Sequence, residues 1–483
     1  MKTFQLLKRK KELLFISQLQ KQFPKAEIFL VGGIVRDTLL GLPSKDYDFV
    51  IRNIPTGKLL TFLKTQGWVD LVGKKFGVLK FTPRGSKLQI DIALPRTEHA
   101  FNTGGYKDFD VQSDYKLPIE DDLARRDFTI NALAYNWQNN KIIDLYKGLD
   151  DLKKKRIKTV GLAEDRFKED YSRTLRAIRF ACQLDFVIEN KTWTAIKKLT
   201  PKINTKIKGD FVVPRETIAK EMVKAFVNNP AKAFMLYDKS GLAKQLMPEL
   251  LKMKKCPQPK NFHSEGDVWQ HTLMCLENLQ SKKFQKRFDN SPLTAELVLA
   301  TIFHDLGKPY TIKKVDRLRF NNHDTKSAEL STEILNRLKI SNAEVDIDKV
   351  NWLCRKHMIT THTKKSPMKN ITLEKYFFNK ATPGFDLLRL TFADVMATVP
   401  QKTKRPDFKD FNSIVKQIDR LRKTASQKQS LPKVIINGHE IMKYFKLKSG
   451  PAIGKLLNAL REEQLKGKIK TKQQAYAWLK KHV

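Results

Sequence analysis

Strand-like apolar runs are confined to the first 150 residues of this chain, and this asymmetry restricts its fold more than any other feature. An apolar run at 28–31 ends in Gly32-Gly33 and is followed by a helical pattern to Leu40. Further strand-like runs, with a helical segment between the first two, lie at 47–51, 77–81 and 88–94. Short apolar runs that alternate with helical periodicity predict a small α/β domain ending near residue 150.

Beyond residue 150 the pattern is almost entirely helical, and 483 residues are too many for one hydrophobic core. Segments rich in Pro and Lys interrupt the helical pattern at 252–260 and 401–407, so we place domain boundaries there. The predicted fold class is α+β, with four domains at 1–150, 151–255, 256–400 and 401–483. Within the first domain, the Gly-, Asp- and Lys-rich stretch 101–116 predicts a mobile loop.

Charge indicates the class of partner. Lys and Arg number 92 against 51 acidic residues, a net charge of +41, which predicts a polyanionic partner such as nucleic acid or an anionic membrane surface. No apolar run of about 18 residues or more occurs, so a membrane span is not predicted. The cysteines are scattered without a CxxC pair, which favours a reducing cytoplasm over a disulfide framework or a zinc finger: Cys182, Cys256, Cys275 and Cys354.

Three aspartates form a candidate metal site in the first domain. Asp46 and Asp48 flank Tyr47 in a strand-like run, and alternate residues of a strand point to the same face. Asp91 can bring a third carboxylate to that face from a neighbouring strand. Clustered carboxylates repel one another unless cations neutralise them, and oxygen-only ligands favour Mg²⁺. The pattern predicts two Mg²⁺ ions that activate an attacking hydroxyl and stabilise a leaving pyrophosphate.

Signals for phosphate binding lie on both sides of these aspartates. Gly32-Gly33 ends a strand and opens a helix, where bare backbone N–H groups and the helix dipole suit a triphosphate. Two later segments, 122–133 and 169–180, are rich in arginine. In the second segment a helix would carry one cationic stripe beside Asp170, made of Arg173, Arg176 and Arg179. A stripe of this kind is also typical of a solvated helix face.

Taken together, these motifs resemble the signature of a known enzyme family. They occur in order as LVGGIVRD at 30–37, KDYD at 45–48, RRDFTINA at 125–132, DLYKG at 144–148 and EDYSR at 169–173. The set resembles the class II tRNA nucleotidyltransferases and bacterial poly(A) polymerases, members of the polymerase-beta superfamily. The resemblance implies a polymerase-beta-like nucleotidyltransferase head at 1–150, followed by an all-helical neck and body at 151–255 that recognises the base and binds RNA.

The resemblance also implies roles for individual residues. Asp46 and Asp48 would hold the catalytic Mg²⁺ ions, with Asp91 assisting. The implied nucleotide-binding residues are Gly32, Gly33, Arg36, Arg125, Arg126, Asp127, Asn131, Asp170, Arg173, Arg176 and Arg179. The implied substrates are CTP, ATP and tRNA, whose 3′ end receives C, C and A without a nucleic-acid template.

In this family Asp170 and Arg173 would read the incoming base. Cytosine and adenine each present an amino donor beside a ring-nitrogen acceptor, which an acceptor-only Asp and a donor-only Arg satisfy together. Uracil and guanine leave both partners unsatisfied, at about 1–3 kcal/mol for each lost partner. Tyr171-Ser172 replaces the usual Pro-Leu, which predicts an altered order or rate of addition. Thr217 replaces the usual Arg, which predicts a change in helix packing.

Six of the nine histidines fall between residues 263 and 362: His263, His271, His304, His323, His357 and His362. The HDLGK run at 304–308 and the pattern around His271 resemble an HD phosphohydrolase domain at 256–400. The candidate metal ligands are His271, His304, Asp305 and Asp394, with His323 and His357 for a second ion. The resemblance implies a divalent transition metal or Mg²⁺, and removal of phosphates or opening of 2′,3′-cyclic phosphates. An inactive, structural HD fold is the alternative.

Several interpretations remain open. The helical tail at 401–483 resembles the C-terminal part of HD-containing tRNA nucleotidyltransferases and either packs helices or contacts RNA. An enzyme that adds only CC or only A fits the same motifs. A poly(A) polymerase fits less well, because no arginine-dense RRRFR-like stretch occurs. An HD phosphohydrolase with an RNA-binding N-terminal domain, or a non-catalytic tRNA-binding scaffold, would not need the three aspartates.

Overall fold

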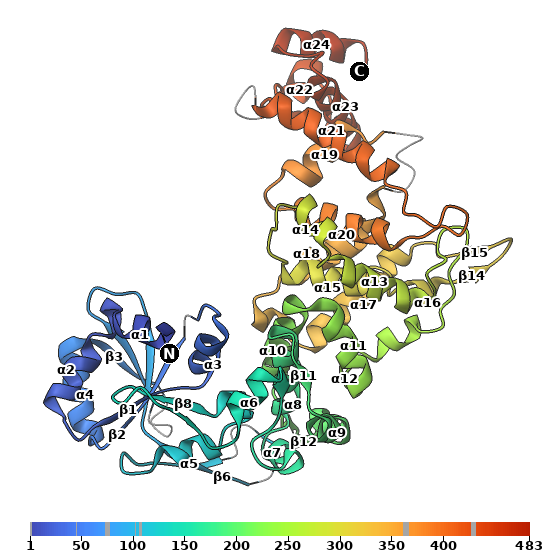
Figure 1. Cartoon of the computed structure of the whole chain (residues 1–483). Coiled ribbons are helices and arrows are strands. Elements are labelled where there is room, and N and C mark those ends of the chain that lie inside the picture. Colours follow the sequence, from blue (N-terminus) through green and yellow to red (C-terminus); the bar gives the residue numbers. More distant parts are fainter. Residues whose placement is uncertain are drawn as a thin grey trace. The chain divides into compact units, whose positions relative to one another are not determined.

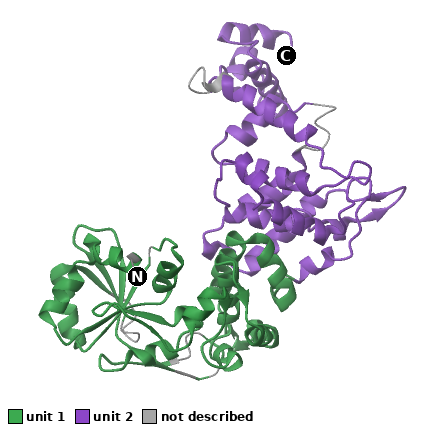
Figure 2. Cartoon of the chain, in the orientation of Figure 1, with its two compact units in different colours: residues 1–247 green, residues 248–483 purple. Residues whose placement is uncertain are grey.

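The computed structural model describes residues 2–44, 46–72, 78–101, 103–105, 109–360, 367–426 and 431–483. The chain divides into two compact units, Met1–Met247 and Pro248–Val483 (Figure 2). The first contains a sheet and helices, and the described part of the second is helical apart from one short strand pair, so the predicted α+β class is confirmed (Figure 1). The boundaries of the four predicted domains stay predictions, and His362 lies outside the described residues.

Seven strands form the main sheet of the first unit, in the order β3-β4-β5-β2-β1-β8-β9. They are β1 Glu27–Val31, β2 Tyr47–Arg52, β3 Gly67–Val72, β4 Val78–Pro83, β5 Ile90–Ala93, β8 Leu133–Asn136 and β9 Ile142–Asp144. Neighbouring strands are antiparallel except β2 and β5, which run parallel. The four strands predicted from apolar runs are present, although Gly77 lies outside the described residues, and β3, β8 and β9 are additional.

Helices of the N-terminal segment accompany this sheet. They are α1 Lys2–Lys8, α2 Phe15–Gln22, α3 Gly33–Leu40 and α4 Thr56–Gln66. Strand β1 is buried from Ile28 to Val31 and β2 from Phe49 to Ile51, and these two stretches are continuous apolar runs. A smaller hydrophobic cluster joins Phe29 and Val50 of these strands to Leu123 of α5 Ile119–Ala124.

The prediction of a loop at 101–116 was wrong for part of its length. Strand β7, Phe109–Ser113, pairs with β6, Arg96–Ala100, in an antiparallel hairpin outside the main sheet. The two strands are polar because the hairpin carries ion pairs instead of a hydrophobic core; Glu98, for example, accepts from Arg96 and from Arg125. Residues 102 and 106–108 lie outside the described part of the chain, so the predicted mobility of this segment stays a prediction.

The remainder of the first unit is helical, as the sequence predicts, with only two-residue strand pieces. The helices are α6 Gly148–Lys153, α7 Ala163–Glu169, α8 Ser172–Gln183, α9 Asn190–Leu199, α10 Arg215–Asn228, α11 Pro230–Ser240 and α12 Leu242–Leu246. The strand pieces pair as β10 Arg156–Ile157 with β11 Val187–Ile188, and β12 Lys206–Ile207 with β13 Asp210–Phe211. Helix α8 packs along α10, which buries Leu175 and Ile178 and leaves its arginines facing a polar cavity.

The second unit is built from two groups of helices. The first comprises α13 Val268–Asn278, α14 Lys282–Arg287, α15 Ala295–Phe303, α16 Lys308–Thr311, α17 His323–Arg337, α18 Ile347–Lys356, α19 Asn370–Leu373 and α20 Gly384–Ala397. The strand pair is β14 Lys313–Lys314 and β15 Leu318–Arg319. The second group comprises α21 Lys409–Ser426, α22 Gly438–Phe445, α23 Pro451–Leu465 and α24 Lys472–Lys480. Its core includes Ile441, Leu460 and Leu479, so the tail has its own hydrophobic cluster.

Among the described residues, no helix has both the length and the apolar character needed to cross a membrane.

Candidate active site and candidate metal centre

Two of the three predicted catalytic aspartates lie side by side on neighbouring strands. Asp48 of β2 is the register partner of Asp91 of the parallel strand β5, so both side chains lie on one face of the sheet. Asp46 immediately precedes β2 and lines the same two cavities as Asp48. Burial raises the pKa of the Asp48 carboxyl to about 6; the Arg126 guanidinium opposes this shift, and the charges of Asp91 and Asp46 add to it. This crowding of negative charge favours a bound cation.

Glycine at position 32 lets helix α3 begin beside the Asp48 carboxylate. Gly32 lies between β1 and α3 with a φ of +74°, a left-handed conformation that favours glycine. A Cβ atom on Gly32 would lie 2.8 Å from Nη1 of Arg126 and 3.5 Å from Oδ2 of Asp48. Glycine at position 32 therefore lets the backbone, the Arg126 guanidinium and the Asp48 carboxylate lie close together.

All of the predicted nucleotide-binding residues line one cavity of about 1220 Å³. They are Gly32, Gly33, Arg36, Arg125, Arg126, Asp127, Asn131, Asp170, Arg173, Arg176 and Arg179, and Asp46 and Asp48 lie in the same wall. Asp91 lines an adjoining space with the other two aspartates. Motifs separated by more than a hundred residues in sequence thus meet around one space, which is large enough for a nucleoside triphosphate.

Carboxylates hold the arginines of this cavity in place. Asp122, fully buried, pairs with Arg125 at 2.5 Å and with Arg126 at 2.9 Å. Asp127 accepts from Arg176 at 2.6 Å and from Asn131 at 3.0 Å. Burial alone would raise the pKa of Asp127, but the Arg176 guanidinium keeps it well below the usual range. The guanidinium groups are therefore oriented in advance, which lowers the entropic cost of binding an anion.

The predicted arginine stripe faces the cavity from helix α8. Arg179 donates to Glu221 of α10 at 2.5 Å, and Arg176 reaches across to Asp127. Asp170 and Arg173 are both more than nine-tenths buried at the start of the helix. Asp170 accepts from the backbone N–H of Ser172 at 2.8 Å, so one carboxylate oxygen is fixed and the acceptor is held at the cavity wall.

The residues that the sequence did not identify are mainly those that orient the arginines. Glu98 and Glu221 line the cavity as partners of Arg125 and Arg179, from which they are distant in sequence. Thr217 also lines the cavity. The structure therefore places Thr217 at the cavity, and the predicted effect of its replacement on helix packing stays a prediction.

Tyr171 connects the base-reading segment to the β6–β7 hairpin. Its backbone N–H donates to the carbonyl of Gly104 at 3.0 Å. A Cβ atom on Gly104, whose φ is +79°, would lie only 2.0 Å from the Tyr171 ring. The aromatic ring thus occupies the space that the missing side chain of Gly104 leaves.

The second unit brings the six predicted metal ligands together at the centre of its first helical group. His271 comes from α13, His304 and Asp305 directly follow α15, and Asp394 comes from α20. His323 begins α17 and His357 directly follows α18. His271 Nε2 lies 3.0 Å from Asp394 Oδ1, and the Nε2 atoms of His323 and His357 are 3.3 Å apart. Asp305 lies between the two sets: its Oδ2 is 3.5 Å from His304 and its Oδ1 is 3.4 Å from His323.

Each of the four imidazoles has its Nδ1 atom beside an acceptor. The partners are the Glu265 carboxylate for His271 at 2.9 Å, and backbone carbonyls for His304 (Thr301, 2.8 Å), His323 (Phe320, 2.8 Å) and His357 (Cys354, 2.7 Å). With the proton on Nδ1, each Nε2 atom would offer a lone pair to the middle of the cluster. These nitrogen atoms and the carboxylates match the ligands that a metal ion takes.

The carboxylates of the cluster shift the pKa values of its histidines. Burial lowers the pKa of His304, yet the neighbouring Asp305 carboxylate more than offsets this and raises it to about 9. Lys308 places its Nζ 2.6 Å from Asp305 Oδ2, and Gln258 accepts from the same ammonium at 2.8 Å. Within the described residues, His304 Nε2 is buried without a hydrogen-bond partner. Neither Glu265, Lys308 nor the nearby thiol of Cys275 was identified from the sequence.

Comparison with known proteins places these features in a family. Residues 28–158 match the Poly A polymerase head domain, residues 185–254 match the "Probable RNA and SrmB- binding site of polymerase A", and residues 322–479 match domain 2 of tRNA nucleotidyltransferases. The chain is 32% identical to the multifunctional CCA protein of Methylobacillus flagellatus, over 72% of this chain and 77% of that one. It is 28% identical to the A-adding tRNA nucleotidyltransferase of Deinococcus radiodurans, over 94% of both chains.

The fold agrees with a solved structure of the same kind. The Bacillus stearothermophilus CCA-adding enzyme, solved in complex with CTP, matches 98% of this chain and 97% of its own, with a TM-score of 0.63 and 21% identity. The sequence matches and the motifs gathered around the carboxylates together identify the chain as a nucleotidyltransferase. It belongs to the class II tRNA nucleotidyltransferases, the family of the CCA-adding enzymes.

Proposed function

We propose that this enzyme adds C, C and A in turn to the 3′ end of tRNA, using CTP and ATP and no nucleic-acid template. The observation that carries the proposal is the single cavity in which catalytic carboxylates, a series of arginines and the Asp170–Arg173 pair lie together. The +41 net charge suits a tRNA partner. The unpaired thiols of all four cysteines agree with a reducing cytoplasm as its location.

The donor set of the cavity fits Mg²⁺. Asp46, Asp48 and Asp91 offer only oxygen atoms, the ligands that Mg²⁺ prefers, and the raised pKa of Asp48 marks the charge that an ion would neutralise. Bound there, Mg²⁺ would stabilise negative charge on the reacting phosphate and the leaving pyrophosphate.

The chain's own groups supply binding, orientation and selection. Arg36, Arg126 and Arg176 line the cavity, and their carboxylate and amide partners hold them ready to donate to phosphate oxygens. At the other end, Asp170 accepts from the amino group of C or A and Arg173 donates to the adjacent ring nitrogen. Selection then depends on protein side chains alone.

The test is extension of a tRNA transcript that ends at the discriminator base, resolved to single nucleotides, in Mg²⁺. We expect two added residues with CTP alone and a third only when ATP is also present. Addition only to tRNA that already ends in CC would instead indicate an A-adding enzyme, the activity named for the relative that matches the full length of this chain. Arrest after CC with both nucleotides would indicate a CC-adding enzyme, and a long tail from ATP alone a poly(A) polymerase.

A second activity, phosphohydrolysis, is favoured by the histidine cluster of the second unit. Four convergent Nε2 atoms and two carboxylates match the donors that divalent transition metals take, and Asp305 has one oxygen facing each half of the cluster. Ions bound there would supply Lewis-acid activation for hydrolysis. Lys308, beside Asp305, is placed to attract a phosphate. Release of phosphate from a 3′-phosphorylated RNA end, or opening of a 2′,3′-cyclic phosphate, would test this activity.

A further inference from the structure

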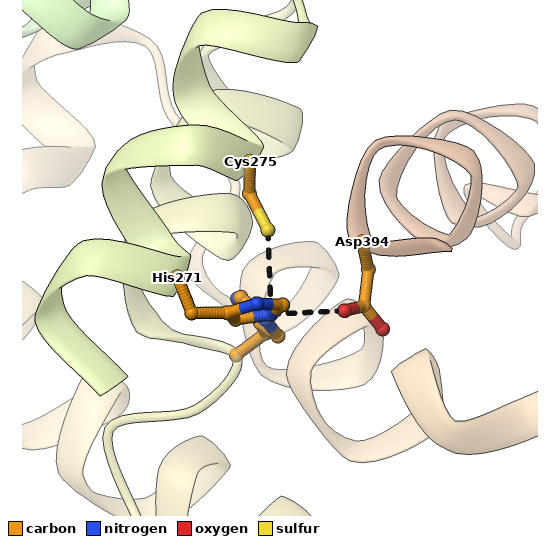
Figure 3. A group of neighbouring side chains, drawn as sticks. His271, Cys275 and Asp394 are labelled. Atoms are coloured by element: carbon orange, nitrogen blue, oxygen red, sulfur yellow. Dashed lines mark hydrogen bonds and ion pairs between the residues drawn. The ribbon is translucent and has the colours of Figure 1, made fainter. Parts of the chain in front are cut away.

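A cysteine thiol lies within the histidine cluster and no role described above uses it. Cys275 follows His271 by one turn of α13, so both side chains project from the same face of the helix. Its Sγ lies 3.5 Å from His271 Nε2, and Figure 3 shows the thiol pointing at the imidazole edge while Asp394 approaches from a different helix. Cys275 is fully buried.

The thiol belongs to a complete set of four donors. The ligand atoms of His271, Cys275, His304 and Asp394 all lie within 4.8 Å of one another. Tetrahedral Zn²⁺ has bonds of about 2.0–2.3 Å, which place its ligands roughly 3.3–3.7 Å apart. The Cys275–His271 separation of 3.5 Å and the His271–Asp394 separation of 3.0 Å are close to such edges.

An independent observation points to an ion at this position. His304 Nε2 is buried without a hydrogen-bond partner among the described residues, and it faces the same three donors. A buried nitrogen without a partner destabilises the folded protein. Coordination of a cation by this lone pair would remove that cost.

Another buried cysteine of the second unit contrasts with Cys275. Cys354 has a backbone carbonyl, that of Ala300, 3.9 Å from its Sγ. Among the described residues Cys354 belongs to none of the groups of possible metal ligands, whereas Cys275 faces two imidazoles and a carboxylate.

We propose that Cys275 is a metal ligand, and that with His271, His304 and Asp394 it forms a tetrahedral N₂SO site selective for Zn²⁺ or a similarly thiophilic ion. The inference rests on the proposed metal centre and specifies its ion. Binding deprotonates the thiol, the sulfur lone pair forms the bond to the ion, and the proton passes to solvent. A thiolate ligand disfavours Mg²⁺. The ion held by Cys275, His271, His304 and Asp394 would therefore differ from the Mg²⁺ proposed for the first unit.

Cobalt spectroscopy of the full-length protein tests the ligand directly. Ions are removed with a chelator and Co²⁺ is added while the near-ultraviolet absorption is recorded. We expect a thiolate-to-cobalt charge-transfer band that saturates at one equivalent and is absent from Cys275→Ser. The carboxylates of the first unit also bind Co²⁺, but oxygen ligands give no such band. Cys182→Ser is the control, since this buried thiol lies in the first unit, and it should keep the band.

Zinc competition supplies the second measurement. We expect Cys275→Ser and Cys275→Ala to bind Zn²⁺ at least about tenfold more weakly than the parent, while circular dichroism shows the same helical content. The thiolate ligand would be overturned if both variants kept the Zn²⁺ affinity of the parent and the parent showed no charge-transfer band. The metal centre would still stand if His304→Ala lost the ion. If His304→Ala changed neither Zn²⁺ nor Co²⁺ binding, both the thiolate ligand and the metal centre would be overturned.

Discussion

The two units gather different kinds of side chain at their candidate sites. In the first, carboxylates and guanidinium groups line a cavity, and two carboxylates of its wall, Glu98 and Asp127, hold Arg125 and Arg176. In the second, imidazoles, two carboxylates and a thiol lie together and are mostly buried. A wall of salt-bridged arginines suits a large anion, whereas a buried cluster of nitrogen, oxygen and sulfur donors suits a metal ion.

Loss of a candidate catalytic carboxylate should lower the rate of nucleotide addition more than any other change considered. The effect should be limited to the activity of the first unit. We expect Asp48→Asn to lower the rate of nucleotide addition at least about 10³-fold. The variant lacks a carboxylate ligand of the ion, which would stabilise the transition state by several kcal/mol. Single-turnover extension of tRNA measures this rate. Phosphohydrolysis and Zn²⁺ content should stay unchanged, and loss of either would show that the sites are not separate.

The matching change in the second unit is His304→Ala. It removes the unpartnered Nε2 from the cluster, so ion affinity should fall by about 10–100-fold or more and phosphohydrolysis should be lost. Nucleotide addition should stay within about twofold of the parent, as expected for distant, independent sites. His439→Ala, at an exposed histidine of α22, is the control. Metal content that is equal in the two variants would contradict the assignment.

Arg173→Ala should weaken discrimination between nucleotides more than it weakens tRNA binding. Without the guanidinium, the partner that distinguishes C and A from U and G is lost, so discrimination should fall by about 1–3 kcal/mol, or roughly 5- to 150-fold. The ratio of kcat/KM for CTP to that for UTP measures this loss, and tRNA affinity provides the internal reference. If UTP and GTP stay as strongly rejected as in the parent, Arg173 does not read the base.

The contact between Tyr171 and Gly104 should give the smallest effect. Gly104→Ala places a methyl group 2.0 Å from the ring and strains a positive φ, so we expect the addition rate to fall by about tenfold. Gly85→Ala is a matched control, because its φ of +75° is similar and its Cβ would meet no atom within 4 Å. Tyr171→Ala in the Gly104→Ala background restores room for the methyl group and should recover most of the rate. Equal losses from the two glycine variants would indicate backbone strain alone.

The sequence predicted the buried strands better than the edge strands. Residues 28–31 of β1 and 49–51 of β2 are continuous apolar runs, and all of them are buried. In β3, which is at an edge, Trp68 is 81% exposed, and β9 has only three residues, so neither carries a clear apolar pattern. The β6–β7 hairpin is stabilised by ion pairs such as Arg125–Glu98, which hydrophobic periodicity does not detect.

In the candidate sites, residues within one contiguous motif were predicted and several residues brought together by packing were missed. Residues inside contiguous motifs, such as Gly32 and Arg126, were predicted because the spacing of each motif reflects one local structure. Glu221 was missed because it meets Arg179 only when α10 packs on α8. Cys275 differs, since its position four residues after His271 on a helix was a usable signal for a shared ligand face.

Equilibrium binding of the four nucleoside triphosphates, in Mg²⁺ and without tRNA, tests the central claim that the protein cavity itself selects the base. CTP and ATP should bind with similar affinity, and UTP and GTP at least about tenfold more weakly, since each lost partner costs about 1–3 kcal/mol. Equal binding of all four nucleotides would contradict the account and would assign selection to the bound RNA.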